Sequence, residues 1–249
     1  MPDHFLLAGN ALRYRRIPGD AGHPCLVFLH EGLGCVDAWK DFPDRLCRET
    51  GCSGLLFDRV GHGRSAALPA PRKSDYLHRH AREELPAVIG ELIPDRPHIL
   101  VGHSDGGSIA LIHAALKPKH LLGAITEAAH VFVEAETIAG IEAAVAAYRA
   151  GRLAGLEKYH GEKTEDLFFA WADTWRSPWF RSWEITELLP PIEAPLLVIQ
   201  GRDDAYATDA QVDAIVSGVS GPATPLLIDN CGHAPHREQA AVVLDAVSY

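Results

Sequence analysis

The sequence predicts an α/β fold, in which a mostly parallel sheet carries helices on both faces. Candidate strands alternate with candidate helices along most of the 249 residues, which is the pattern of such sheets. Candidate strands such as Cys25–Leu29 and Leu196–Ile199 are apolar throughout, as strands covered on both sides are. The turn Gly102-His103-Ser104-Asp105-Gly106 separates a strand-like run from a helix-like run. A chain of this length accommodates these features in one large domain.

The expected elements follow from apolar runs and from the turn residues between them. Strands are expected at residues 11–17, 25–30, 53–58, 97–102, 121–128, 195–200 and 224–229. Helices are expected at residues 36–49, 74–92, 106–117, 207–219 and 234–247. Because proline lacks a backbone N–H, Pro86 should kink or split the second of these helices.

Residues 129–189 interrupt this rhythm with helix-like material at 138–150 and 167–183. Four tryptophans recur there at steps of four: Trp171, Trp175, Trp179 and Trp183. On a helix this spacing keeps them on one slowly drifting face, although Pro178 should break the second half. The rings either hold this segment to the rest of the protein or line an apolar pocket, for which Trp171 and Trp175 are our candidates.

Ser104 is the candidate nucleophile. A serine on a sharp turn from strand to helix projects its hydroxyl away from the sheet, and the flanking glycines leave room for close packing. Downstream, one apolar run ends in Gly201-Arg202-Asp203-Asp204 and the next leads into Cys231-Gly232-His233. The chain order serine, acid, histidine is that of one hydrolase architecture.

With these residues in place, the chain resembles the α/β-hydrolase superfamily from about Leu12 to its C-terminus. The segments that carry the resemblance are His30–Gly34, Asp58–Ser65, Gly102–Gly106, Gly201–Asp204 and Gly232–His233. The resemblance implies an α/β-hydrolase fold with a helical cap inserted after the sixth strand. The corresponding division is a core at residues 1–128, a cap at 129–189 and the remainder of the core at 190–249.

The catalytic roles are expectations drawn from this resemblance and from the chemistry of serine. Ser104 would attack, His233 would take its proton, and Asp204 would orient the imidazole ring. Similar hydrolases place the acid three residues after the glycine that ends the strand, which favours Asp204 over Asp203. Some relatives supply the acid after the preceding strand, which leaves Glu127 as a further alternative.

Most of the 14 histidines must be structural or exposed. His236, one helical turn beyond His233, is expected to flank the site, and His103 is expected to pack beneath the serine turn. The segment His30-Glu31-Gly32-Leu33-Gly34 begins like a zinc motif, but Gly34 stands where the second ligand belongs. We therefore expect neither a metal nor a cofactor.

The same glycine-rich turn is the expected oxyanion hole. By resemblance its backbone N–H donors are those of Gly32, with Glu31 or Leu33 as alternatives, and of Asp105 at the helix start. The commoner family pattern has glycine where this chain has Glu31. We expect this carboxylate either to pair with Arg59, the favoured interpretation, or to contact substrate. Glu31 and Leu33 are therefore tentative pocket residues.

Bulk properties restrict the partners. The formal net charge of −10 argues against nucleic acid or a membrane as a partner. The short basic run Arg13-Tyr14-Arg15-Arg16 is interpreted as a solvated strand edge. Residues 1–12 lack the pattern of a signal peptide, and the five cysteines lack a disulfide or metal spacing, so we expect a cytoplasmic protein. The oligomeric state stays open, a homodimer included.

The function expected from the sequence is hydrolysis of carboxylic esters with small to medium apolar groups, through an acyl-enzyme and without a cofactor. Thioester, lactone, amide or C–C bond cleavage uses the same residues and stays open. Two other classes are a ligand-binding protein that keeps the fold without turnover, and a cofactor-free peroxidative enzyme.

Overall fold

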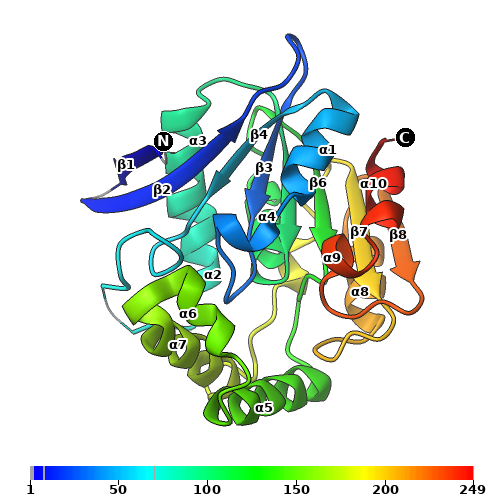
Figure 1. The fold of residues 1–249 in the computed structure, drawn as a ribbon. Helices are drawn as coiled ribbons and strands as arrows, with labels where there is room; N and C mark the ends of the chain where they lie inside the picture. Colours follow the sequence, from blue (N-terminus) through cyan, green and yellow to red (C-terminus); the bar gives the residue numbers. More distant parts are fainter. Residues whose placement is uncertain (1–2, 8, 70, 249) are drawn as a thin grey trace.

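An eight-stranded sheet forms the centre of this computed structural model, which describes residues 3–7, 9–69 and 71–248 (Figure 1). Its strands are β1 (Asp3–Leu7), β2 (Asn10–Ile17), β3 (Cys25–Leu29), β4 (Ser53–Phe57), β5 (His98–His103), β6 (Leu121–Glu127), β7 (Leu196–Gly201) and β8 (Ala223–Ile228). They lie in the order β1-β2-β4-β3-β5-β6-β7-β8, antiparallel at β1–β2 and β2–β4 and parallel elsewhere. The predicted fold class, a mostly parallel sheet within an α/β fold, is confirmed.

Each expected strand is present with ends within one residue, whereas β1 was not expected. Helices pack on both faces of the sheet. One core contains alternate residues of β3, such as Val27 and Leu29, together with residues of α3 (Leu85–Leu92), α4 (Asp105–Ala114) and α8 (Ala210–Gly218). The other core contains Leu26 and Phe28 with residues of α1 (Phe42–Thr50) and α10 (Ala240–Ser248). Burial on both faces explains why these strands are apolar throughout.

Three of the expected helices are divided. The first consists of η1 (Val36–Trp39) and α1, separated where Lys40 has a φ of 58°. The second consists of α2 (Tyr76–Arg79), the π-helical turn η2 (His80–Glu84) and α3. Pro86 lies in the first turn of α3, directly after the π-helical turn, and the helix divides there as expected for a residue without a backbone N–H. The last expected helix divides into α9 (Pro235–Glu238) and α10.

A helical layer lies beneath the carboxyl ends of the parallel strands (Figure 1). It consists of α5 (Ala135–Arg149), η3 (Ala154–Leu156), α6 (Glu157–His160), η4 (Gly161–Lys163), α7 (Thr164–Arg176) and η5 (Thr186–Leu188). Helix α7 ends before Pro178, as expected from the ring of proline. The chain enters and leaves this layer side by side, because the N–H of Ile185 donates to the carbonyl of Val131 at 2.8 Å.

The layer, called the cap below, is fastened to the core through buried polar groups. The imidazole of His160 accepts a hydrogen bond from the N–H of Gly63 at 2.9 Å and reaches the carbonyl of Leu33 at 2.8 Å. Since one ring nitrogen accepts and the other donates, His160 is neutral here. Lys163 donates to the carbonyl of Gly63 at 2.9 Å. These contacts join the cap to two loops at the carboxyl edge of the sheet.

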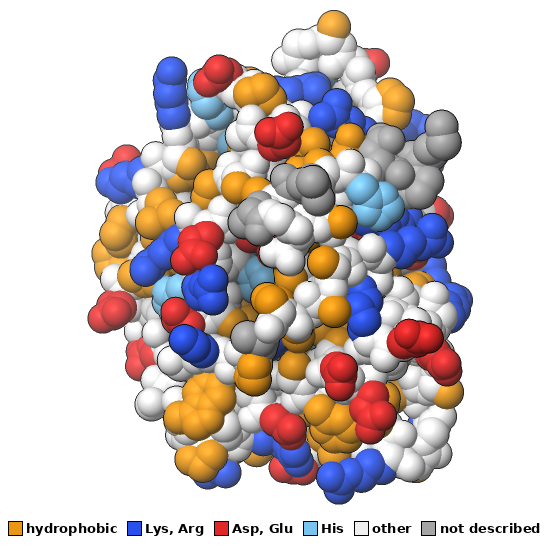
Figure 2. Space-filling model, turned by 90° about the vertical axis from the view of Figure 1, so that its left-hand side faces the viewer, with side chains coloured by type: hydrophobic (Ala, Val, Ile, Leu, Met, Phe, Trp, Pro, Cys, Tyr) orange, Lys and Arg blue, Asp and Glu red, His pale blue; other side chains and the backbone are white. Residues whose placement is uncertain are grey.

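The basic run at residues 13–16 is not simply a solvated edge, which corrects our interpretation. Arg13 is buried, and its guanidinium donates to both carboxylate oxygens of Asp37 at 2.8 Å. The reason is that β1 occupies the edge of the sheet, so β2 lies inside it. On the face that includes this edge, acidic and basic side chains are interspersed (Figure 2). None of the helices in the described ranges is both long and apolar enough to cross a bilayer.

Several histidines are buried in this fold, which predicts loss of stability in mild acid. Burial lowers the pKa of His30, His62 and His103 well below the ordinary value. Below pH 6.5 the unfolded chain binds protons that the folded protein does not, so the free energy of unfolding falls as the pH falls. Each such histidine contributes about 1 kcal/mol of loss between pH 7.5 and 5.5. The urea midpoint should therefore drop over this interval.

His233, whose pKa is raised, works in the opposite direction and offsets a part of that loss. Urea unfolding followed by circular dichroism at the two pH values measures the net effect. Equal midpoints would contradict the expectation.

Candidate active site

Ser104 lies at the junction of β5 and α4 in a strained conformation, with φ 52° and ψ −117°. Close packing on both sides enforces the turn. A Cβ on Gly106 would lie 1.9 Å from the carbonyl oxygen of Leu29, and one on Gly102 would lie 2.3 Å from that of Gly106. Glycine at these two positions therefore lets α4 start directly against β3 and β5, with Ser104 projecting from the carboxyl edge of the sheet.

Ser104, His233 and Asp204 form one hydrogen-bonded chain. Nε2 of His233 lies 3.0 Å from Oγ of Ser104, and Nδ1 lies 2.9 Å from both carboxylate oxygens of Asp204. The Asp204 side chain is fully buried, and its orientation is fixed by the N–H of Tyr206 at 2.8 Å. Because Nδ1 faces the carboxylate, it carries the ring proton, and Nε2 is free to accept the proton of the serine hydroxyl.

The pKa of His233 reflects two opposing influences. Burial lowers it, but the hydrogen bond and charge of Asp204 raise it, as do the charges of Glu31 and Asp105, and the net shift is upward. An imidazole in this setting is a stronger base than an isolated one. The backbone at His233 is also fixed, because Nε2 of His103 donates to its carbonyl at 2.7 Å.

The alternative acids and bases lie elsewhere. Glu127 is buried and accepts hydrogen bonds from Nδ1 of His236 at 2.7 Å and from its N–H at 3.0 Å, so this acid pairs with His236 and not with His233. Asp203 is exposed, with its N–H bonded to the carbonyl of Cys231. Burial raises the pKa of the Cys231 thiol to about 11, so this cysteine stays protonated at neutral pH.

The loop after β3 brings Gly32 beside Ser104. A Cβ on Gly32 would lie 2.5 Å from the indole of Trp171 and 3.3 Å from the carboxyl carbon of Asp105. In the part of the chain that the structure describes, no group accepts a hydrogen bond from the N–H of Gly32 or of Asp105. Both N–H groups are therefore available to an oxygen bound next to Ser104.

The expected ion pair between Glu31 and Arg59 does not form, which corrects that interpretation. Arg59 is buried and donates to the backbone carbonyl of Glu31 at 2.8 Å, and it lies 3.3 Å from the His30 ring. Burial lowers the pKa of its guanidinium, and the negative charges of Asp105 and Glu84 act in the opposite direction. The Glu31 carboxylate is left to accept a long hydrogen bond, 3.4 Å, from the N–H of Leu33.

Asp105 also takes part in a network that the sequence did not suggest. Its carboxylate accepts a hydrogen bond from the hydroxyl of Tyr76 at 2.9 Å, and that hydroxyl accepts one from Nε1 of Trp175 at 2.9 Å. These residues come from α4, α2 and α7. The network therefore links the start of the serine helix to the cap, and no spacing pattern in the sequence indicates such a contact.

A cavity of about 70 Å³ opens at Ser104. It is lined by Glu31, Gly32, Leu33, Ser104, Asp105, His130, Thr137, Ile141, Trp171, Trp175, Tyr206 and His233. The four tentative pocket residues all lie here. The sequence analysis missed four others, among them His130 and Tyr206, whose positions depend on how the cap packs. A neighbouring cavity of about 180 Å³ shares the side chains of Glu31 and His233.

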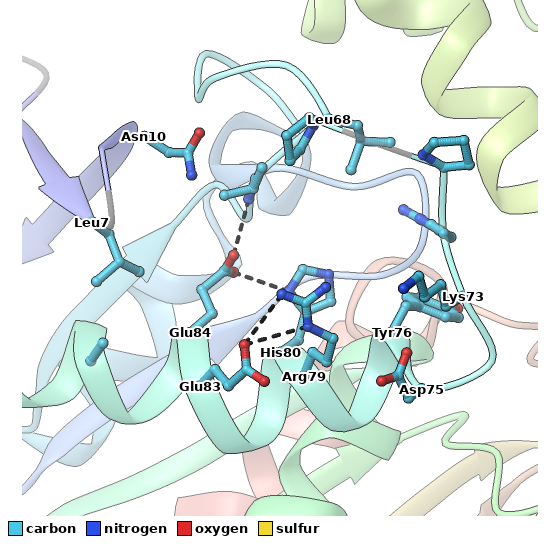
Figure 3. Close-up of a pocket in the computed structure, with 15 residues that line it drawn as sticks. Leu7, Asn10, Leu68, Lys73, Asp75, Tyr76, Arg79, His80, Glu83 and Glu84 are labelled. Atoms are coloured by element: carbon cyan, nitrogen blue, oxygen red, sulfur yellow. Dashed lines mark hydrogen bonds and ion pairs between the residues drawn. The ribbon is translucent and has the colours of Figure 1, made fainter.

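A cavity of about 300 Å³ lies away from Ser104 (Figure 3). Its walls are formed by the ends of β1 and β2, by the loop around Leu68, and by α2 and η2. Two ion pairs lie among its polar groups: Glu83 with Arg79, and Glu84 with His80. None of the described residues that line it is a serine, threonine or cysteine, whereas Ser104 is hydrogen-bonded to His233, so Ser104 stays the candidate site. The described residues contain no group of three or more His, Cys, Asp or Glu side chains placed to hold a metal ion.

Comparison with known proteins agrees with this architecture. A model of the alpha/beta hydrolase family matches residues 26–246. The chain is 28% identical to 2-succinyl-6-hydroxy-2,4-cyclohexadiene-1-carboxylate synthase of Salmonella paratyphi C, with 95% of this chain and 97% of the relative covered.

Solved structures are similar at lower identity. An alpha/beta hydrolase enzyme from a Medee basin deep-sea metagenome library matches with a TM-score of 0.79 at 17% identity, covering 98% of this chain and 95% of the other. A serine hydrolase involved in carbazole degradation matches with a TM-score of 0.74 at 18% identity, covering 99% and 96%. At such identities the likeness concerns the fold alone.

Substitution of Gly106 by alanine should unfold the serine turn. The added Cβ would meet the carbonyl of Leu29, a backbone atom that has no room to move, so we expect a loss of about 3 kcal/mol or more in the free energy of unfolding. Gly90→Ala is the matched control, because Gly90 is an exposed position of α3 with nothing within 4 Å of an added Cβ. That variant should gain about 0.5–1 kcal/mol. Urea unfolding of both variants compares them, and a stable Gly106→Ala protein would refute the packing argument.

Proposed function

The chain belongs to the alpha/beta hydrolase family, and from this premise we propose that it is a serine hydrolase that cleaves carboxylic esters through an acyl-enzyme. The observation that carries the proposal is the hydrogen-bonded chain from Oγ of Ser104 through His233 to Asp204, with distances of 3.0 and 2.9 Å. A serine hydroxyl needs such a base to attack a carbonyl carbon. The unpaired N–H groups of Gly32 and Asp105 support it, because acyl transfer develops negative charge on an oxygen beside the nucleophile.

The geometry suggests the following sequence of steps. Oγ of Ser104 attacks the carbonyl carbon while Nε2 of His233 takes the hydroxyl proton, and the new oxyanion is held by the N–H groups of Gly32 and Asp105. The imidazolium, stabilised by Asp204, then gives its proton to the departing alkoxide as the ester C–O bond breaks. Water, deprotonated by His233, attacks the acyl-serine, and collapse of the second tetrahedral intermediate releases the acid and restores the Ser104 hydroxyl.

The activity named for the Salmonella relative is not a good guide to this site. Its name designates a product with a carboxylate group. Among the described residues that line the cavity at Ser104 there is no lysine or arginine, whereas Glu31 and Asp105 are both present. A carboxylate in this cavity would face like charges without a compensating cation. This electrostatic environment favours hydrolysis of a substrate that brings no negative charge.

Ser104→Ala should abolish ester turnover without affecting the fold. Removing Oγ removes the atom that forms the acyl bond, so kcat for p-nitrophenyl acetate should fall by about 10³-fold or more, with an unchanged circular dichroism spectrum and melting temperature. A fluorophosphonate should add one mass equivalent to the wild-type peptide that contains Ser104 and none to the variant. Turnover close to wild type in the variant would end the assignment of the nucleophile.

Asp204→Asn should impair catalysis far more than Asp203→Asn. An amide at position 204 loses the charge and the favoured orientation of His233, so kcat should fall by about 10³-fold or more. Asp203 is exposed and contacts neither the imidazole nor Ser104, so its amide should change kcat by less than about threefold. Rates of p-nitrophenyl acetate hydrolysis for the two proteins decide the matter. The opposite ranking would move the acid by one residue.

A further inference from the structure

The carboxylate of Glu31 has no cationic partner within the described residues, although it lines the cavity at Ser104. It is half-buried, and its one hydrogen bond, from the N–H of Leu33, is 3.4 Å long. A partly desolvated carboxylate with so little compensation is unfavourable unless something else supplies positive charge. Substrate is one source of that charge.

The nearby cations are engaged elsewhere. Arg59 donates to the backbone carbonyl of Glu31 rather than to its carboxylate, and the charges of Asp105 and Glu84 act on it. Lys163 donates to the carbonyls of Gly63 and Ser65, which belong to the loop after β4. Arg237 lines the neighbouring cavity, but it is exposed and makes no ion pair with Glu31. The charge of Glu31 also acts on His233, but the two nitrogens of that imidazole are bonded to Ser104 and Asp204. The carboxylate therefore has no ion-pair partner among the described residues.

Aromatic side chains also line the cavity. Trp171 and Trp175 from α7 and Tyr206 from the loop after β7 line it. Trp171 lies against Gly32, so its indole faces the same loop as Glu31. Tryptophan and tyrosine rings attract cations through the negative potential of their faces, and such rings around a carboxylate suit an alkylammonium head group.

We propose that the substrate carries an alkylammonium group, held between the carboxylate of Glu31 and the rings of Trp171, Trp175 and Tyr206. This inference rests on the proposed function, because it assigns a substrate class to the same site. Charge recognition comes from Glu31, and the rings accept the alkyl groups. The second carboxylate of the cavity, Asp105, adds to the negative potential, although its oxygen already accepts the hydroxyl of Tyr76.

A pair of esters that differ in one charge tests the proposal. Acetylcholine and 3,3-dimethylbutyl acetate have the same shape, with a quaternary nitrogen in the first and carbon in the second. The wild-type protein should favour acetylcholine in kcat/KM by about tenfold or more, as expected for one favourable charge contact in a partly exposed site. Glu31→Gln keeps the shape of the side chain and removes the charge, so the ratio of the two kcat/KM values should fall about tenfold.

The ratio is the quantity to compare, because any effect of Glu31 on His233 acts on both esters. Glu49→Gln is the matched control: it removes the same charge from an exposed position of α1 and should leave the ratio unchanged. A ratio near one in the wild-type protein would overturn the proposal. So would equal ratios in the wild-type protein and Glu31→Gln.

A binding measurement separates this inference from the proposed function. Titration with tetramethylammonium chloride should change the fluorescence of the cavity tryptophans in a saturable way, with about tenfold weaker binding to Glu31→Gln and no such change with sodium chloride. Saturable binding in a protein that neither hydrolyses esters nor reacts with a fluorophosphonate would reject the esterase and keep the ammonium site. Ester hydrolysis without tetramethylammonium binding or charge preference would reject the ammonium site and keep the esterase.

Discussion

The close approach of α4 to the sheet is the constraint on which the candidate site depends. Without a Cβ on Gly106, the first turn of this helix lies directly against the carbonyl of Leu29, and the chain must reverse direction within one residue. Ser104 therefore takes a positive φ, a conformation that costs of order 1–3 kcal/mol and persists only where the surrounding packing requires it. The same turn makes Asp105 the first residue of α4, and its N–H has no acceptor among the described residues. Packing between a helix and a strand thus fixes the candidate nucleophile and a candidate hydrogen-bond donor together.

Neutral buried histidines support this arrangement in a second way. His103 holds the backbone of His233, and His160 joins the cap to the loop of Leu33. Burial lowers the pKa of both rings, so each provides a directional hydrogen bond without bringing a charge into the core. His233 differs because Asp204 raises its pKa. The protein therefore places one basic imidazole among several that resist protonation.

The sequence predicted the features that local chemistry determines. The strands were found because burial on both faces requires unbroken apolar runs, and the turn at Ser104 because close packing requires its glycines. β1 was missed, since DHFLL is short and half polar, and its pairing with β2 depends on a turn at Gly9. The walls of the cavity were predicted only in part. Trp171 and Trp175 stood out by their spacing, whereas Tyr206 and His130 reach the cavity only through the way the cap packs on the core.

Arg59 and Glu31 show why an ion pair cannot be inferred from the sequence alone, even where two segments are expected to meet in the fold. The guanidinium does approach Glu31, but it satisfies the backbone carbonyl, and its charge faces Asp105 and Glu84. Burying Arg59 in this way stabilises the loop after β3 and leaves the carboxylate of Glu31 directed to the cavity. The carboxylate accepts only a long hydrogen bond from the N–H of Leu33, and its charge also raises the pKa of His233. Because it has no ion-pair partner among the described residues, a cationic substrate group would complete its surroundings.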